Sequence, residues 1–235
     1  GTSYNIQIRA VNSEGAGIAS SSIVGSPYAN QITLNAFGTS VTEDFNTLES
    51  AGSSSSLPLG FYMSESGGNS NTTYTASTGS SNSGNTYSFG TDSDRALGGI
   101  RSGSLNPTLG GKIINGTGVT LNTVVISYTG ETWRVATANR LDQLDFQYST
   151  DATSLTDGTW TDFDALDYSN AGQATGNGSL QHTSSLSDTL TNLGTVNGGF
   201  FWIRWNDYDA SGSEDGMSID DLSLTPICKA GSITN

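Results

Sequence analysis

The chain has 235 residues and a formal net charge of −14 at pH 7, because 22 acidic residues face only eight lysines and arginines. So acidic a chain repels a phosphate backbone, which argues against nucleic acid as a partner. No run of about eighteen apolar residues occurs, so we expect no membrane-spanning helix. Few charges and abundant Gly, Ser, Thr and Asn are typical of extracellular β proteins, and the single cysteine, Cys228, excludes an internal disulfide.

The first 27 residues carry a strand pattern that is too short for a domain. Apolar and polar residues alternate over 4–10, a Gly-rich turn follows, and 20–24 can return as a second strand. This segment resembles the last strands of a fibronectin type III domain, through the run Arg9-Ala10-Val11-Asn12 and the glycine at 15. A lone hairpin is marginal in water, so we expect a remnant cut from a longer modular chain, with 28–40 as connector.

Residues 41–226 show repeated strand patterns with Gly, Asn, Asp or Ser between them and no sustained helical periodicity. The low-complexity stretch 50–88 contains recurring aromatic residues, which favours short strands and ordered loops over disorder. We therefore predict an all-β, two-sheet antiparallel β-sandwich of the jelly-roll type, with an immunoglobulin-like sandwich as the alternative and 227–235 as a tail. Strands are expected at 32–37, 110–115, 119–129, 144–148, 160–166, 181–190, 200–209 and 216–224.

The strand at 200–209 alternates clearly, so Phe201, Ile203 and Trp205 are predicted to face the core. Trp202 and Arg204 then share the opposite face. That face is either a lid over packed structure or a surface that meets a ligand. We expect a hairpin in which this strand is followed directly by its neighbour at 216–224.

The loop between these strands holds several carboxylates that repel one another unless a cation or water screens them. The pattern D-x-D-x-S-G that begins with Asp207 and Asp209 matches the first half of a calcium-binding loop. The twelfth position is Ser218 and not a bidentate glutamate, which excludes an EF-hand, although Glu214 or Asp215 could substitute. The alternative is a solvated acidic hairpin tip.

The main domain resembles a jelly-roll module of large secreted bacterial proteins, and its ends are similar to those of MAM and carbohydrate-binding jelly rolls. The motifs that carry this resemblance are Asp44-Phe45-Asn46-Thr47-Leu48, Asp94-Arg95-Ala96-Leu97-Gly98, Gly130-Glu131-x-Trp133-Arg134, Leu144-Asp145-Phe146-Gln147-Tyr148-Ser149, and Phe201-Trp202-Ile203-Arg204-Trp205 with Ile219-Asp220-Asp221.

The resemblance implies that the first and last strands of the domain lie side by side and share a structural cation, Ca²⁺. Its ligands would be Glu43 or Asp44 together with Asp220 or Asp221. One of the last two carboxylates should point inward, where an unpaired charge costs several kcal/mol. The alternative to a cation is an ion pair with an arginine of the same motifs, namely Arg95, Arg134 or Arg204.

Aromatic rings stack on the apolar faces of sugars, while amides, carboxylates and guanidinium groups bond the hydroxyls. Most of the aromatic residues belong to the core, but five residues are candidates for ligand binding: Trp202, Arg204, Trp133, Tyr62 and Tyr74. The lone His182 has no triad spacing around it, and acidic residues are too numerous for a carboxylate pair to indicate a glycosidase.

These patterns predict a non-catalytic module of a secreted, multidomain bacterial protein, located outside the cell or at its surface beside neighbouring domains. It would bind a glycan or cell-surface polysaccharide and carry structural calcium. One alternative is a structural or adhesive spacer without a small ligand. Another is a polysaccharide-active or phosphoester hydrolase, which would require a cleft with perturbed carboxylates.

Overall fold

The computed structural model describes residues 31–91, 93–170 and 172–228, together with four short strands nearer the start of the chain. These strands pair antiparallel with one another, β1 (Tyr4–Ile6) with β4 (Ile23–Gly25) and β2 (Val11–Asn12) with β3 (Gly15–Ala16). The structure does not describe the other residues up to 30 or those from 229 onward. The predictions made for them, namely the side-chain alternation of the first segment, the connector up to residue 30 and the C-terminal tail, therefore lie outside the described residues.

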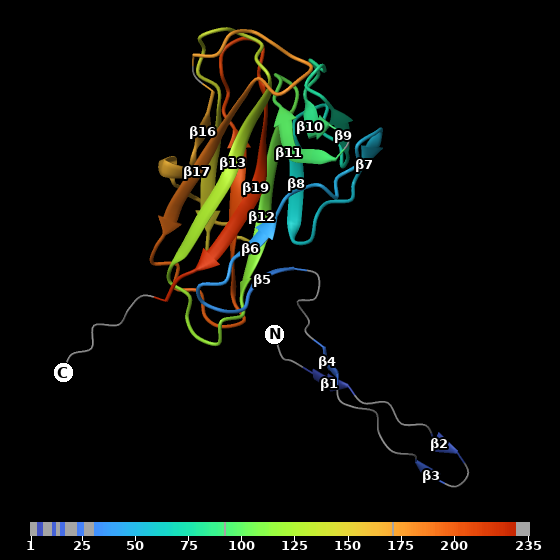
Figure 1. The fold of residues 1–235 in the computed structure, drawn as a ribbon, viewed down its shortest axis with the longest axis vertical. Coiled ribbons are helices and arrows are strands. Elements are labelled where there is room, and N and C mark those ends of the chain that lie inside the picture. The colour runs from blue at the N-terminus through green and yellow to red at the C-terminus, as the bar shows by residue number, and fades with distance from the viewer. Residues whose placement is uncertain are drawn as a thin grey trace, which may run out of the picture.

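The main domain is a sandwich of two β-sheets, which confirms the predicted fold class (Figure 1). The eight-stranded sheet contains, in spatial order, β17 (His182–Leu190), β13 (Val124–Arg134), β19 (Gly216–Pro226), β11 (Asp94–Ile100), β10 (Asn85–Thr91), β9 (Tyr74–Ser77) and β7 (Ser53–Ser54), with β6 (Val41–Glu43) also paired to β19. The seven-stranded sheet contains β15 (Thr161–Asp162), β14 (Gln143–Ser149), β18 (Phe200–Asp207), β12 (Asn106–Asn115) and β5 (Ile32–Leu34), with β16 (Tyr168–Ser169) on β14 and β8 (Phe61–Ser66) on β12.

Successive strands cross repeatedly between the sheets, as the jelly-roll prediction requires. The strands β11, β12, β13 and β14 alternate from one sheet to the other, and so do β17, β18 and β19. The predicted hairpin at 200–224 is therefore wrong. Both edges of β18 are taken by β12 and β14, and both edges of β19 by β11 and β13, so the acidic loop 208–215 connects the two sheets.

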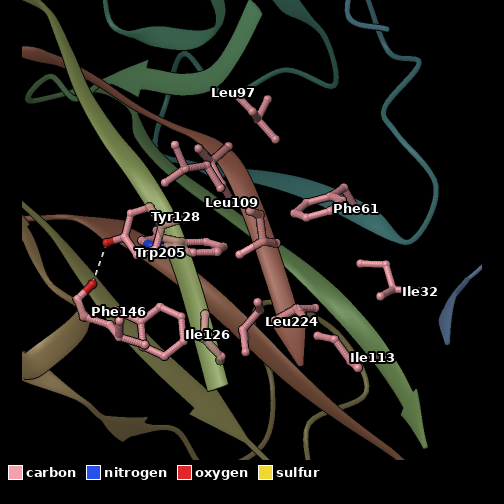
Figure 2. Close-up of a cluster of buried hydrophobic side chains, with 14 of the residues drawn as sticks. Ile32, Phe61, Leu97, Leu109, Ile113, Ile126, Tyr128, Phe146, Trp205 and Leu224 are labelled. Carbon is pink, nitrogen blue, oxygen red and sulfur yellow. Dashed lines mark hydrogen bonds between the residues drawn. The ribbon is translucent and has the colours of Figure 1, made fainter. Parts of the chain in front are cut away.

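The core lies between the sheets and is built from the alternation that the sequence predicts. Phe201, Ile203 and Trp205 of β18 are all buried in it. The Trp205 ring meets Tyr128 of the opposite sheet at 5.2 Å between ring centres and Phe146 of the neighbouring strand at 5.3 Å, both edge to face (Figure 2). Edge-to-face pairs add to the stabilisation from burial.

Strand β13 continues past residue 129, where the expected strand ended, and runs through Gly130. Gly130 pairs with Ser184 on one side and Ile219 on the other, so it lies inside the sheet. A Cβ atom at this position would lie 2.2 Å from the ring of Tyr168, whose hydroxyl bonds Thr132 at 2.8 Å. The glycine therefore makes room for a ring and does not turn the chain.

The strand predicted at 160–166 is largely replaced by a turn. Only Thr161–Asp162 is extended, and Asp164–Leu166 forms one turn of 3₁₀ helix. Phe163 packs against the core and Leu166 is fully buried within it. This spacing of three matches the period of a 3₁₀ turn, which places both side chains on one face.

The packing at Gly130 predicts that Gly130→Ala destabilises the domain, because the new methyl group overlaps the Tyr168 ring. Overpacking of this kind costs roughly 1–3 kcal/mol, so a thermal melt should show a clear fall in Tm. Gly103→Ala is the matched control, since a Cβ at Gly103 meets nothing within 4 Å. Equal Tm values for the two variants would contradict this role of Gly130.

Candidate functional site

The seven-stranded sheet turns one face away from the core, and this outer face carries polar side chains in aligned rows. One row runs from Asp145 through Asn206 and Thr108 to Ser64, from β14 across to β8. The next row, listed by strand, is Gln147, Arg204, Gly110 and Tyr62. Strand register therefore brings residues from four distant segments into one surface.

Arg204 is held firmly at the centre of the outer face. Its Nε donates to Gln147 Oε1 at 2.7 Å and its Nη1 donates to the Leu155 carbonyl at 2.6 Å. The guanidinium also lies over the Trp160 ring, 3.9 Å from the ring centre. A cation above an aromatic face is attracted by the ring quadrupole, so Arg204 is oriented from three directions.

Beside Arg204 the outer face is hollowed by a cavity of about 620 Å³ with an acidic lining, formed by Gln143, Asp145, Gln147, Asp162, Asp164, Asp167 and Ser169. Gln143 Nε2 donates to Asp145 Oδ1 at 2.6 Å and to Asp167 Oδ2 at 2.9 Å, which draws the two carboxylates together. Burial raises the pKa of both groups, and their acidic neighbours raise it further. We call this cavity the acidic hollow.

Trp202, one of the candidates for ligand binding, is buried on this face. Its side chain is only 3% exposed, and it packs with Leu155 and Trp160 of the loop that follows β14. Tyr62 covers it at 4.9 Å between ring centres and is itself 39% exposed. The loop folds back over the strand and turns Trp202 into a small second core, so Tyr62 presents the accessible ring.

The other two aromatic candidates lie away from the outer face. Trp133 belongs to β13 in the opposite sheet, where it is buried, stacks on Phe89 and donates from Nε1 to Glu131 Oε2 at 2.8 Å. Tyr74 is fully buried, and its hydroxyl accepts the Glu49 N–H at 3.0 Å. Of the five predicted ligand-binding residues, the structure brings together Trp202, Arg204 and Tyr62.

The first and last strands of the main domain do lie side by side, because β6 pairs with β19 and Glu43 stands opposite Leu222. The carboxylates of this end do not converge, however. Glu43 Oε1 accepts the Phe45 N–H at 2.9 Å, and Asp44 bonds within the same short loop. One of Asp220 and Asp221 was predicted to point inward; Asp220 is buried, whereas Asp221, with φ of 48°, is exposed to solvent.

Asp220 lies close to the buried Glu131 of β13. Burial, together with the charges of Glu131, Asp221 and Asp94, raises the pKa of Asp220 to about 8. The Asp221 N–H donates to Asp220 Oδ1 at 2.7 Å and opposes this shift. Ion pairs form at Arg101 and Arg140, two arginines that the sequence analysis did not single out.

The two acids of the predicted calcium loop differ in burial, although both contact Arg101. Asp207 is 4% exposed, and its Oδ2 accepts the Arg101 N–H at 3.1 Å. Asp209 is exposed and pairs with Arg101 Nη2 at 3.0 Å. In the part of the chain that the structure describes, no group of three or more His, Cys, Asp or Glu side chains forms a ready-made metal site. Bound calcium stays a prediction.

A buried acidic cluster beside Asp207 escaped the sequence analysis. Arg140 Nη2 contacts Asp142 at 2.8 Å, Asp215 at 3.2 Å and Glu214 at 3.8 Å. Burial and the neighbouring Asp142 raise the pKa of Glu214 to about 7. Arg140 and Asp142 come from a segment about seventy residues before the acidic loop, so no local spacing could have linked them.

Neither a protein-family profile nor a curated protein matches the sequence. Among solved structures, the chain is similar to the K1 cleaved adhesin domain of Lys-gingipain from Porphyromonas gingivalis W83, with 9% identity over 81% of this chain and 100% of that one, and a TM-score of 0.47. The K2 cleaved adhesin domain of Lys-gingipain gives 14% identity over 79% and 97% of the two chains, with a TM-score of 0.45.

A third similarity is to the CBM22-1 xylan-binding domain of Xyn10C from Paenibacillus barcinonensis, with 10% identity over 83% of this chain and 99% of that one, and a TM-score of 0.39. Across the described residues, no helix has both the length and the apolar character needed to cross a membrane.

The environment of Asp220 predicts a pH-dependent stability. Its pKa is about 8 in the folded chain against an ordinary value of 3.8, so the folded state holds a proton that the unfolded state releases between these values. Stability should therefore fall as pH rises through this window, by at most about 1.4 kcal/mol per pH unit from this group.

Asp220→Asn removes the titrating group, so its Tm should fall less than that of the unaltered chain between pH 5 and 9, as measured by thermal melts. Glu49→Gln, which alters an exposed acid, serves as the control and should keep the original slope. The same slope in Asp220→Asn as in the unaltered chain would show that Asp220 is not the responsible group.

Proposed function

We propose that this chain is a non-catalytic, glycan-binding module of a secreted, multidomain bacterial protein, and that the outer face is its binding surface. The observation that carries the proposal is the exposed ring of Tyr62 in the same row as Gln147 and Arg204, beside the acidic hollow. An aromatic ring offers a stacking surface for the apolar face of a sugar, and the row beside it offers donors and acceptors for hydroxyl groups.

The rigidity of these groups supports a binding role. Gln147 Oε1 accepts from Arg204 and also from Asn206 Nδ2 at 2.8 Å, and Asn206 Oδ1 accepts from Thr108 at 2.9 Å. These hydrogen bonds already hold the side chains in place. The conformational entropy that they lose when a ligand binds is therefore small. A cleft of this kind suits a polar polymer better than a small apolar molecule, since its lining is mostly carboxylate and amide.

The charge of the acidic hollow bears on the kind of glycan. Its four carboxylates, Asp145, Asp162, Asp164 and Asp167, make a negative field inside a concave surface. Such a field repels uronic acids and sulfated sugars. We therefore expect neutral or amino-sugar polymers to bind better than acidic polymers of similar length, and we expect added salt to reduce this difference.

Affinity electrophoresis against neutral, amino-sugar and acidic polysaccharides tests the proposal. We expect retardation by a neutral or amino-sugar polymer and a loss of at least about tenfold in affinity for Tyr62→Ala, the cost of removing one stacking ring. Leu180→Ala is the control, since Leu180 is exposed to a similar extent, 41% against 39%, and lies outside the outer face.

Each outcome separates the alternatives. Retardation by no polysaccharide would favour the structural or adhesive spacer. Binding that survives in Tyr62→Ala would place the glycan elsewhere on the chain. Release of reducing ends from a bound polymer would favour the hydrolase alternative, for which Asp145 and Asp167 are the carboxylates of the acidic hollow that Gln143 draws together.

A further inference from the structure

A smaller cavity lies on the outer face between β8 and the loop that follows β14. Its volume is about 250 Å³, and its walls include Tyr62, Ser64, Ser154, Leu155, Thr156 and Trp202. Every lining residue is uncharged, whereas carboxylates line the acidic hollow. Pockets that enclose a whole drug-sized ligand hold roughly 300–1,000 Å³. This cavity, which we call the side pocket, therefore suits a substituent of a sugar better than a whole ligand.

Gly110 of β12 makes space for the apolar wall of the side pocket. A Cβ atom at Gly110 would lie 2.6 Å from Leu155 Cδ2 and 3.0 Å from Arg204 Cβ. The glycine therefore lets the Leu155 side chain lie close against the sheet, where it is buried and packs with Trp202. Leucine and indole together form an apolar surface beside the exposed Tyr62 ring.

Hydrogen bonds to one carboxylate hold the loop 153–157 in place, although most of this loop is exposed. Asp157 bonds the hydroxyl of Thr153 and accepts the N–H groups of Thr153 and Ser154 at 2.7 and 2.9 Å. These hydrogen bonds, led by that of the Thr153 hydroxyl, lower the pKa of Asp157 to about 2. The wall of the side pocket is therefore ordered before a ligand binds, which reduces the entropy lost on binding.

Trp202, in the wall of the side pocket, has an indole N–H that is not used by the fold. Its Nε1 atom is buried and has no hydrogen-bond partner within the described portion of the chain. A buried donor without an acceptor is unfavourable, so a ligand that supplies an acceptor gains from it. The Tyr62 ring covers Trp202 but is itself partly exposed, so a small shift of this ring can admit the acceptor.

We infer that the side pocket receives the acetyl substituent of a sugar, carried as an acetamido group or as an acetyl ester. The methyl of an acetyl group suits the apolar surface of Leu155 and Trp202. Its carbonyl oxygen accepts hydrogen bonds from the Trp202 indole N–H and from the hydroxyls of the loop. A sugar hydroxyl brings no methyl to bury, and an ammonium group would lose its water without meeting a carboxylate.

This inference rests on the proposed function, because it takes the outer face as the glycan-binding surface. In the row that contains Arg204, Gln147 lines the acidic hollow at one end and Tyr62 lines the side pocket at the other. A polymer that follows this row meets both cavities. The inference narrows the expected polymers to those that carry acetylated sugars.

Saturation-transfer NMR tests the side pocket with four probes at millimolar concentration: N-acetylglucosamine, 6-O-acetylglucose, glucose and glucosamine. We expect the acetyl methyl protons of an acetylated probe to receive the strongest saturation, and glucose and glucosamine to receive little. A signal from N-acetylglucosamine alone assigns the pocket to acetamido groups, and one from 6-O-acetylglucose alone assigns it to acetyl esters. Either result supports the inference, whereas equal saturation of all four sugars overturns it.

Two variants locate the acetyl group. Ser154→Leu places a larger side chain in the side pocket and should lose the methyl signal. Ser223→Leu, at a half-buried serine of β19 in the opposite sheet, is the matched control and should keep it. A signal that survives in Ser154→Leu would place the acetyl group elsewhere and overturn the inference.

The failures of the two proposals can be told apart. If a polysaccharide retards the unaltered chain but not Tyr62→Ala, and neither acetylated sugar gives a methyl signal, the acetyl inference is wrong and the glycan-binding function stands. If no polysaccharide retards the chain and no acetylated sugar binds, both are wrong.

Discussion

The packing of β18 in the middle of the seven-stranded sheet is the constraint on which the other features depend. Its inner side chains, with Trp205 between Tyr128 and Phe146, tie this sheet to the eight-stranded one. Once that face is buried, the pleat sends Arg204 and Asn206 outward. The same strand ends at Asp207, inside the acidic cluster. One strand therefore sets the core, the outer face and the buried carboxylates.

The outer face and the buried acidic cluster differ in how their charged side chains are stabilised. On the outer face the carboxylates and Arg204 are partly exposed and hydrogen-bonded to amides. Water and the amide dipoles therefore both stabilise their charges. In the buried cluster water is excluded and one arginine serves several carboxylates. Electrostatic interactions are stronger in a medium of low dielectric constant, so an unpartnered oxygen matters more there than on the outer face.

Several sequence-based interpretations failed because a distant segment used the same residues differently. Gly130 has the character of a turn residue, yet it lies inside β13 because Tyr168 occupies the space of its side chain. Trp202 alternates away from the core as predicted, yet the loop after β14 covers it. The acidic loop was expected at a hairpin tip, whereas strand pairing on both edges of β18 and β19 made it a connection between sheets.

The sequence by itself determined the all-β class, the positions of β12, β13, β14, β17, β18 and β19, and the inward face of β18, because alternation of apolar residues is local and period two is unmistakable over five or more residues. It also indicated that one of Asp220 and Asp221 would be buried, and the structure shows that it is Asp220. Only the tertiary structure decided which strands are neighbours, that Tyr62 shares a row with Arg204, and that Arg140 and Asp142 meet Glu214 and Asp215. Those contacts join segments many tens of residues apart, and they depend on sheet register, which no local pattern encodes.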